Sequence, residues 1–393
     1  MPKKALIFST SYYPFVAGAE VAVKEITDRI PDIQFDLITA KMKKGLPFRE
    51  KIGNVMVYRL GVGVPIIDKL ILPFEGALFA RHLSKKNNYD LFWCIMASFG
   101  SGAGYIKNIF SYKKIPIVLT LQEGDSEEHF RNRWFGLINL SWKLALKRTK
   151  ILTVLSQYLK DRAIRLGYRR EVSVVPNGVN VDKFSMEINK EEKIKIRKEL
   201  GLVEENVVLV TTSRLTKKNG IEDVIKALPK LSTNIKFVIF GEGELEEELK
   251  NLAKSLDVSD RVIWRGYVSH DEMPKYLKAC DIFIRPSLSE GFGNSFIEAM
   301  ACRLPVIATP VGGIVDFLFD PTSHLLPVEL RGTGVQTGYF CQPENPESIV
   351  STVNKILSDP NKNQIVENAY QMVVKKYDWN LVAKQMKEVF ERI

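Results

Sequence analysis

The sequence is poor in the residues that build disulfide frameworks and metal centres. It has four cysteines and four histidines in 393 residues. The cysteines are scattered and stand mostly among apolar residues, so we expect buried thiols in a reducing compartment: Cys94, Cys280, Cys302 and Cys341. The histidines are isolated and lack the spacing of metal ligands. These absences argue against a secreted disulfide scaffold and predict a protein without a metal site.

Long apolar runs are also missing. A membrane-spanning helix needs about 20 consecutive apolar residues. Leu91–Ile106 is uncharged but shorter and contains three glycines, and charged residues interrupt Gly61–Ala80. Residues 1–4 lead directly into a β-prone run, so we expect neither a signal peptide nor a membrane span. The prediction is a cytoplasmic protein.

The charge is unevenly distributed. Residues 1–180 hold 28 Lys and Arg against 15 Asp and Glu, a balance of +13, whereas the rest holds 28 against 31, a balance of −3. A basic first half suits an anionic partner such as a membrane surface, a lipid phosphate or nucleic acid. A basic surface that only keeps the protein soluble explains the charge equally well.

The segment His129–Lys150 mixes aromatic and aliphatic residues with six basic ones. An interfacial helix on an anionic membrane has this composition, and so does an ordinary helix packed on a sheet. One hypothesis is therefore peripheral contact with the inner face of a membrane, while no nucleic-acid partner is expected.

The length suits two domains, and the pattern suggests their class. Near-continuous apolar, β-prone runs alternate with helical segments, as in Ala5–Phe8 followed by a glycine-containing loop and a helix. Such alternation predicts parallel sheets covered on both faces. The expected fold class is α/β with two Rossmann-like domains, residues 1–187 and 188–376.

The most informative stretch lies in the second of these domains. Ile282–Pro286 is predicted to be a buried strand, Ser287–Asn294 a glycine-rich loop, and Ser295 the start of a helix. The N-terminus of a helix favours an anion, and glycines let the backbone approach a ligand closely. Two carboxylates, Glu290 and Glu298, bracket this turn and could hold hydroxyls on either side of a diphosphate.

A structural interpretation of the same residues is also open. Ser295 and Glu298 have the spacing of a capping box, which would give Glu298 a structural role. Glu290 could be a solvated loop residue.

The stretch Glu290-Gly-Phe-Gly-Asn-Ser-Phe-Ile-Glu298, followed by a strand and the turn at Gly312-Gly313, resembles the E-x7-E signature of retaining GT-B glycosyltransferases of family 4. The resemblance is specific from Asp281 to Asp316. It implies that Glu290 contacts hydroxyls of the donor sugar and that Glu298 contacts the ribose of the nucleotide. The loop between them would line the donor: Gly291, Phe292, Gly293 and Asn294.

Two other loops of the second domain fit this resemblance. In the family an Arg and a Lys after the first strand hold the donor diphosphate, which implies Arg214 and, one place earlier than usual, Lys218, with Lys217 as the alternative lysine. Asn219 stands directly before the glycine instead. The backbone after Gly266 would meet the nucleobase, so Tyr267 and Val268 are candidates for the base site.

The first domain departs from the family pattern. The usual Gly-Gly-x-Glu segment is Ala17-Gly-Ala-Glu20 here, which leaves Gly18 as the candidate for ligand approach. Glu20 could simply be an acid favoured by the helix dipole. After the strand ending at Thr120, Gln122 stands about where relatives carry a histidine, and an amide cannot move protons. Glu123, Asp125 or His129 could take over part of the role of that histidine, although His129 also fits a surface or capping residue. Asp125 is in addition a candidate for a carboxylate that orients the acceptor.

The resemblance implies a GT-B fold with two domains facing a central cleft, and a tail helix, residues 377–393, that packs back on the first domain. The implied reaction transfers a sugar from a nucleotide-diphosphate sugar to a hydroxyl acceptor, such as a glycan or lipid-linked glycan, with retention. No metal or other cofactor is expected, because the cations and the loop amides supply the positive field for the leaving diphosphate.

Other functions remain open on the sequence alone. A sugar-nucleotide epimerase of the same fold would bind the same donor, and a basic membrane-surface or nucleic-acid binding protein would need no catalysis. An NAD-dependent oxidoreductase is disfavoured, because Gly241-Glu-Gly243 lacks the third glycine of the dinucleotide fingerprint. The donor base, the sugar, the acceptor and the role of an apparent insertion, Asp320–Thr337, do not follow from the sequence.

Overall fold

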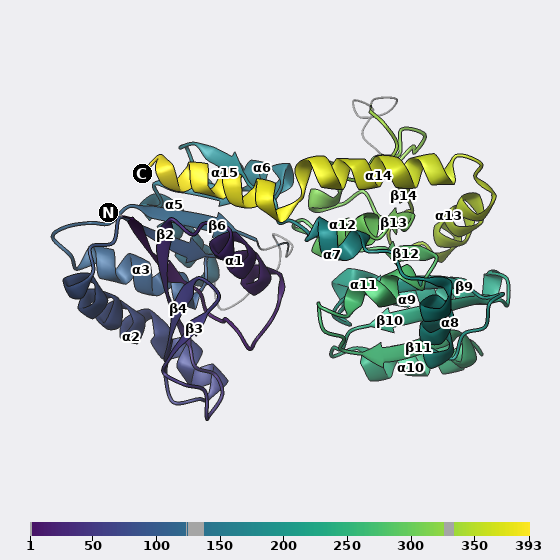
Figure 1. Cartoon of the computed structure of the whole chain (residues 1–393), viewed down its shortest axis with the longest axis horizontal. Coiled ribbons are helices and arrows are strands. Elements are labelled where there is room, and N and C mark those ends of the chain that lie inside the picture. The colour runs from purple at the N-terminus through teal and green to yellow at the C-terminus, as the bar shows by residue number, and fades with distance from the viewer. Residues whose placement is uncertain (1, 123, 125–136, 326–333) are drawn as a thin grey trace. The chain divides into compact units, whose positions relative to one another are not determined.

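The computed structural model describes residues 2–122, 124, 137–325 and 334–393. The chain divides into two compact units, Met1–Asn177 with Trp379–Ile393, and Gly178–Asp378 (Figure 1). The sequence analysis placed the boundary at residue 187. The short helix α7 (Val181–Ser185) belongs instead to the second unit, where the buried Phe184 ring lies 5.2 Å from the ring of His270.

The first unit contains an eight-stranded sheet in the order β3-β4-β2-β1-β5-β6-β7-β8 among its described residues. Neighbouring strands are parallel except β3 and β4, which are antiparallel. The strands are β1 Lys3–Phe8, β2 Ile33–Ala40, β3 Arg49–Ile52, β4 Val55–Leu60, β5 Leu91–Ile95, β6 Ile117–Leu121, β7 Ile151–Val154 and β8 Val172–Val174. The helices are α1 Gly18–Asp28, α2 Pro65–Lys86, α3 Phe99–Ile109, α5 Leu137–Arg148 and α6 Gln157–Arg165.

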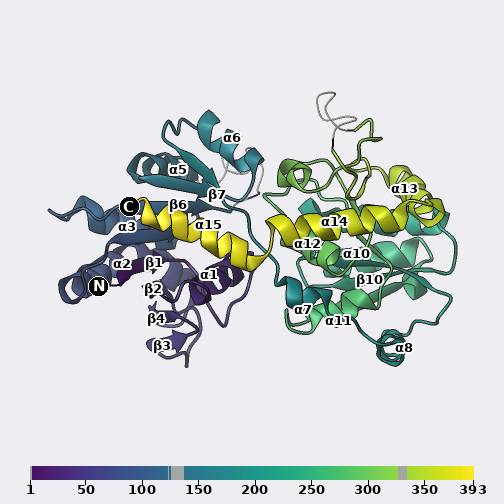
Figure 2. The same ribbon diagram turned by 45° about the horizontal axis from the view of Figure 1, so that its top comes forward.

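The last helix, α15 (Trp379–Glu391), returns to the first unit and lies beside α1 (Figure 1 and Figure 2). Its Phe390 packs edge-on against Trp93 of β5, with ring centroids 5.2 Å apart. The ammonium group of Lys3 donates a hydrogen bond to the carbonyl oxygen of Phe390 at 3.0 Å. The two ends of the chain are therefore held together in one hydrophobic core.

The second unit contains a six-stranded parallel sheet in the order β11-β10-β9-β12-β13-β14 among its described residues. The strands are β9 Val207–Thr212, β10 Ile235–Phe240, β11 Val262–Gly266, β12 Ile282–Arg285, β13 Val306–Ala308 and β14 Tyr339–Phe340. Besides α7, the helices are α8 Lys190–Glu199, α9 Ile221–Ala227, α10 Glu246–Ser255, α11 Met273–Lys278, α12 Asn294–Ala301, α13 Pro346–Ser358 and α14 Lys362–Lys376.

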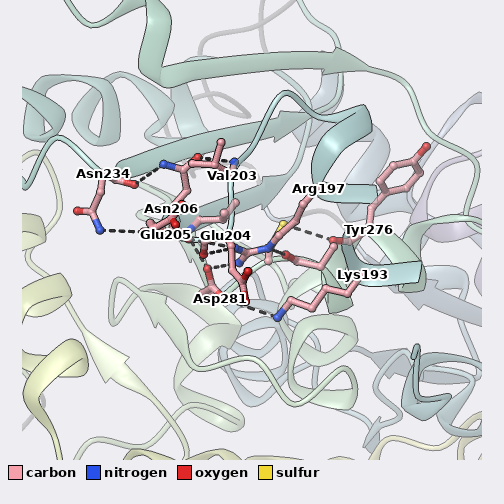
Figure 3. Close-up of polar contacts among 12 residues, drawn as sticks. Lys193, Arg197, Val203, Glu204, Glu205, Asn206, Asn234, Tyr276 and Asp281 are labelled. Carbon is pink, nitrogen blue, oxygen red and sulfur yellow. Dashed lines mark hydrogen bonds and ion pairs between the residues drawn. The ribbon is translucent and has the colours of Figure 1, made fainter. Parts of the chain in front are cut away.

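A buried arginine attaches α8 to the second sheet (Figure 3). The Arg197 guanidinium donates to the carbonyl oxygens of Ala279, Glu204 and Asn206 and pairs with the Asp281 carboxylate at 2.7 Å. Asp281 also accepts the backbone N–H of Val208 at 2.8 Å. Since a buried charge is costly unless it is paired and hydrogen-bonded, this network fixes α8 relative to β9 and β12.

The prediction of two Rossmann-like domains is confirmed. Among the helices of the described residues, none combines the length and apolar character that crossing a membrane requires. All four cysteines are free and buried, and burial raises the pKa of each thiol.

Candidate active site

The loops after β9, β10, β11 and β12 lie at one edge of the second sheet, because parallel strands present their carboxyl ends to the same side. Two close contacts define how these loops fit together. A Cβ on Gly220, which has φ +68°, would lie 2.1 Å from the carbonyl oxygen of Pro286. A Cβ on Gly241 would lie 1.9 Å from the carbonyl oxygen of Ser213. Glycine is thus required where neighbouring loops touch.

Glu290 is held by Arg285, the last residue of β12. The Nη2 atom of Arg285 lies 2.6 Å from Oε2 of Glu290, and the other carboxylate oxygen accepts the backbone N–H of Gly291 at 3.0 Å. Arg285 also donates to the hydroxyls of Ser287 and Ser295, at 3.2 and 2.7 Å. Its buried guanidinium therefore ties both sides of the loop to the strand.

The burial of Arg285 has an electrostatic consequence. Desolvation lowers the pKa of the guanidinium, while the charges of Glu290 and Glu298 oppose this shift. The guanidinium carbon also lies 4.3 Å from the centroid of the Phe296 ring. The sequence analysis did not identify this arginine, although a charged residue inside an apolar strand is a usable signal.

The helix α12 begins differently from the capping-box interpretation. Its N-cap is Gly293, with φ +102°, and no side chain caps it. The Ser295 hydroxyl accepts a hydrogen bond from Arg285 instead. The capping-box interpretation of Glu298 is therefore wrong, and Glu298 is left to interact outside its own helix.

Glu298 pairs with a histidine from another loop. Its Oε1 lies 3.1 Å from Nε2 of His270, in the segment between β11 and α11. The Glu298 side chain is mostly buried, and the His270 side chain is partly exposed. The imidazole N–H can hold one carboxylate oxygen while the other oxygen remains for a ligand. The sequence analysis missed this role of His270, which is 28 residues away along the chain.

The candidate diphosphate cations lie beside the Glu290 loop. The carbonyl oxygen of Lys218 accepts the backbone N–H of Leu288 at 2.7 Å, which joins the loop after β9 to the loop after β12. Arg214 is exposed, and Lys218 is partly exposed. The buried Asn219 amide donates to the carbonyl oxygen of Arg214 at 2.6 Å. The unusual Asn219 therefore has a structural role in shaping this turn.

The remaining candidates in this unit occupy the same edge. Tyr267 is exposed, and its backbone N–H donates to the Glu242 carboxylate at 3.3 Å. Val268 follows it and is partly exposed. The Phe292 ring is buried and lies 5.5 Å from the ring of Phe317. The Phe292 side chain is thus part of the core, and only its backbone could approach a donor.

The glycine turn after β13 contacts the loop that carries Glu290. The N–H of Gly313 donates to the carbonyl oxygen of Glu290 at 3.1 Å. A Cβ on Gly312, with φ +56°, would lie 1.8 Å from that oxygen. Any side chain at Gly312 would displace Glu290.

The candidates in the first unit lie at the loops after β1 and β6. Gly18 is exposed as the first residue of α1. Glu20 is buried and accepts hydrogen bonds from the Ala17 N–H, at 3.0 Å, and from the Ser11 hydroxyl. Glu20 therefore stabilises the start of α1. Gln122 follows the carboxyl end of β6 and is partly exposed.

Three other residues considered in this unit, Asp125, Glu123 and His129, lie outside the described residues, as does part of the 320–337 segment. Of the 129–150 segment, α5 is described from Leu137. Its Trp142, Ala145 and Leu146 are buried, and the ring centroid of Trp142 lies 5.6 Å from the guanidinium carbon of Arg162. These apolar side chains pack inward, and exposed lysines such as Lys143 face solvent.

No cluster of three or more His, Cys, Asp or Glu side chains that could hold a metal ion occurs within residues 2–122, 124, 137–325 and 334–393.

Solved structures are similar to this chain in fold over almost its whole length. Sucrose-phosphate synthase from Thermosynechococcus elongatus matches with a TM-score of 0.81 and 19% identity, over 99% of this chain and 98% of that one. Anabaena HepE, in its complex with UDP-glucose, matches with a TM-score of 0.79 and 21% identity, over 99% and 100%. The chain therefore has the GT-B fold of glycosyltransferases.

Family models identify the family. The model described as glycosyl transferases group 1 matches residues 192–372, and the model described as glycosyltransferase family 4 matches residues 16–183. An uncharacterized glycosyltransferase of Methanocaldococcus jannaschii is 28% identical over 99% of this chain and 98% of its own length. The N-acetyl-alpha-D-glucosaminyl L-malate synthase of Bacillus anthracis is 23% identical over 96% and 94%.

The chain belongs to the group 1 glycosyltransferases, with a family 4 N-terminal domain. It is therefore an enzyme that transfers a sugar, and the family predicted from the E-x7-E signature is confirmed. The alternatives of an epimerase, an NAD-dependent oxidoreductase or a non-catalytic binding protein gain no support from these matches.

Proposed function

We propose that the enzyme transfers a sugar from a nucleotide-diphosphate sugar to a hydroxyl group, with retention of anomeric configuration. The observation that carries this proposal is the pair of fixed carboxylates at one sheet edge. Arg285 holds Glu290 at 2.6 Å before the glycine turn, and His270 holds Glu298 at 3.1 Å after it. Two acceptors of hydrogen bonds on either side of a helix N-terminus suit a ligand with hydroxyls flanking a diphosphate.

Each group then has a defined task in binding the donor. Glu290 accepts hydrogen bonds from the hydroxyls of the sugar, and Glu298 accepts them from the ribose. Arg214 and Lys218 neutralise the diphosphate together with the positive end of the α12 dipole. Tyr267 and Val268 border the base, and Gly18 and Gln122 are proposed to contact the donor from the first unit.

The cations can assist the reaction because negative charge develops on the diphosphate as it leaves. As the bond between the sugar and the diphosphate breaks, charge grows on the leaving oxygen, and cations already in place stabilise it more than they stabilise the ground state. The acceptor hydroxyl attacks from the same face and passes its proton to the leaving phosphate. Glu290 orients the sugar and is not assigned as a nucleophile.

The names of similar proteins support a sugar-nucleotide donor for this enzyme. One structural neighbour is in complex with UDP-glucose, and the name of another is that of a sucrose-phosphate synthase. The B. anthracis relative is named for the transfer of a glucosaminyl group to L-malate. For this chain we propose a nucleoside-diphosphate sugar as the donor and a glycan or lipid-linked glycan as the acceptor, with no metal required.

The test begins with thermal shifts in UDP, GDP, ADP, their sugars and NAD. A ligand that binds only the folded state raises the melting temperature, so one nucleoside diphosphate and its sugars should stabilise the protein. The stabilising sugar nucleotide is then incubated with candidate acceptors, and the anomeric configuration of the product is read by NMR. EDTA should leave the rate unchanged.

The outcomes separate the alternatives. Release of nucleoside diphosphate that depends on an acceptor supports transfer, whereas a changed sugar nucleotide without an acceptor indicates epimerisation. Stabilisation by NAD alone, or an inverted product, would refute the proposal.

A further inference from the structure

The outward face of α2 is apolar over its first half. Ile66, Leu70, Phe74 and Leu78 recur at every fourth position and are 73%, 46%, 66% and 72% exposed. Residues four apart share one face of a helix, so these side chains form a continuous row on the surface. Soluble proteins rarely expose a contiguous apolar patch unless it meets a partner.

The row is not explained by packing within the unit, because α2 buries a different face. Gly76 faces α3, where a Cβ on Gly76 would lie 2.8 Å from the Cβ of Ala103. Leu72 and Ala80 are fully buried on the same inner side. Both views show α2 at the outer edge of the first unit (Figure 1 and Figure 2).

The second half of the α2 surface is cationic. Arg81, Lys85 and Lys86 are exposed on its last two turns. The two acids of the helix are not exposed, since Asp68 is buried against backbone N–H groups and Glu75 is partly buried. The same helix therefore presents an apolar row that continues into positive charge, with no exposed carboxylate of its own.

A pocket of about 260 Å³ lies at this cationic end, between the C-termini of α2 and α3. Its lining includes Arg81, Lys85, Lys107 and Lys113, the exposed aromatic Phe110 and Tyr112, and no acidic side chain. The pocket lies at the amino ends of β5 and β6, into which α2 and α3 lead. It is thus at the opposite edge of the sheet from Gln122.

Lys107 is the unusual member of this pocket. It is only 6% exposed, yet its ammonium has no carboxylate partner among the described residues and lies 4.7 Å from the centroid of the Phe92 ring. Desolvation and the charge of Lys113 lower its pKa. A buried cation among other cations is costly, and an anion in the pocket would offset that cost.

We propose that α2 and the pocket at its C-terminal end form a docking surface for a bilayer that contains anionic lipids. The apolar row enters the boundary of the acyl chains, and the pocket receives a lipid phosphate, which matches the chemistry of an interfacial helix. A second copy of the chain is the poorer occupant, because a face-to-face contact would bring these cationic ends into one interface without counter-charges. The inference does not rest on the proposed donor or reaction.

Co-sedimentation of the full chain with vesicles tests the proposal. Wild-type protein should bind vesicles of phosphatidylcholine with phosphatidylglycerol, bind phosphatidylcholine alone weakly, and bind less as salt is raised. The double variants Phe74→Asp with Leu78→Asp, and Arg81→Glu with Lys85→Glu, should each bind roughly tenfold more weakly or worse. Melting curves, and the milder double variant Phe74→Ser with Leu78→Ser, show whether weaker binding comes from loss of folding.

Matched controls make the surface assignment specific. Met186→Asp with Ile194→Asp changes two exposed apolar residues of the second unit in the same way. Lys143→Glu with Lys147→Glu makes the same charge change on α5. Both controls should bind like wild type, and stabilisation by the nucleotide should persist in every variant.

The proposal would be overturned by wild-type protein that ignores anionic vesicles, by α2 variants that bind as well as wild type, or by a solution dimer that the α2 variants dissociate. At equal ionic strength, free phosphate should displace the wild type from vesicles no more than chloride does, because phosphate lacks the apolar contribution. Stronger displacement by phosphate would also overturn the proposal, because the pocket would then be an anion site and α2 would not be a membrane surface. Loss of nucleotide stabilisation would concern the proposed function instead.

Discussion

Arg285 and Glu290 are five residues apart, and a 2.6 Å ion pair joins them across the start of the glycine turn. The arginine is the last residue of a buried strand and is itself buried, so its orientation is set by the sheet. Arg285 therefore fixes the orientation of the Glu290 carboxylate, and the Gly291 N–H holds the second carboxylate oxygen. A group that is oriented before the substrate arrives loses little free energy to reorganisation during the reaction.

The substitution Arg285→Lys tests whether this orientation matters. Lysine keeps the charge but cannot donate to Ser287, Ser295 and Glu290 together, as the guanidinium fork does. We expect kcat to fall roughly 100-fold while KM for the sugar nucleotide changes little. Steady-state kinetics measure both quantities. An unchanged kcat in a folded variant would remove Arg285 from the proposed mechanism.

Substitutions of Glu290 and Glu298 should impair different steps, sugar transfer and nucleotide binding respectively. Glu290→Gln keeps the size of the side chain but removes its charge, so transfer should drop on the order of 100-fold or more while nucleotide affinity stays close to wild type. Glu298→Ala removes the charged hydrogen-bond acceptor that we propose for the ribose, and such a bond is worth about 1.5–3 kcal/mol. Nucleotide affinity should therefore weaken roughly 10- to 100-fold, as measured by calorimetry. Wild-type transfer rates in both variants would refute the site.

Local pattern was enough to predict much of this architecture. Apolar β-prone runs predicted parallel sheets and individual strands such as Ala5–Phe8 and Ile282–Pro286, and the glycine spacing predicted the loop between Glu290 and Glu298. The partners of these carboxylates depend on contacts that local periodicity does not encode. His270 reaches Glu298 from another loop, and Arg285 looked like part of an apolar strand.

Helix α2 escaped the sequence analysis for a related reason. Apolar residues on both its inner and outer faces hide the helical period, and Pro73 lies inside it. The edge strand β3, whose residues are mostly exposed, likewise carries no apolar signal. Hydrophobic periodicity identifies helices and strands that bury one face. It does not identify a helix whose exposed face is also apolar, or a strand whose residues are mostly exposed.

The Arg197 network predicts a large effect on the stability of the second unit. Arg197→Ala would remove the guanidinium donor from three backbone carbonyl groups and from Asp281, which keeps the Val208 N–H and is partly exposed. Breaking a fully buried ion pair costs about 3–5 kcal/mol, so we expect a loss near the lower end of that range, about 3 kcal/mol. Lys193→Ala removes a more exposed partner 3.9 Å from Asp281 and should cost less than about 1 kcal/mol. Urea unfolding of both variants measures the difference. Equal destabilisation would contradict the role given to Arg197.

Asp36 should make the first unit more stable at acidic pH. Burial raises the pKa of this carboxyl above its usual 3.8, although Tyr89 donates a 2.5 Å hydrogen bond to it and Lys4 and Arg49 lie nearby. A raised pKa means that folding favours the protonated form. The stabilising contribution is therefore present below the unfolded pKa and is lost as the pH rises through the folded pKa.

Asp36→Asn removes the desolvated charge and leaves an amide oxygen for Tyr89. We expect the variant to melt roughly 1–3 °C higher than wild type at pH 7.5, with a smaller gain near pH 4. Asp32 provides the control, because its hydrogen bond to Lys387 lowers its pKa. Asp32→Asn should therefore not stabilise the protein at pH 7.5. Melting curves at both pH values decide the sign, and a pH-independent gain for Asp36→Asn would show that its charge is not the cause.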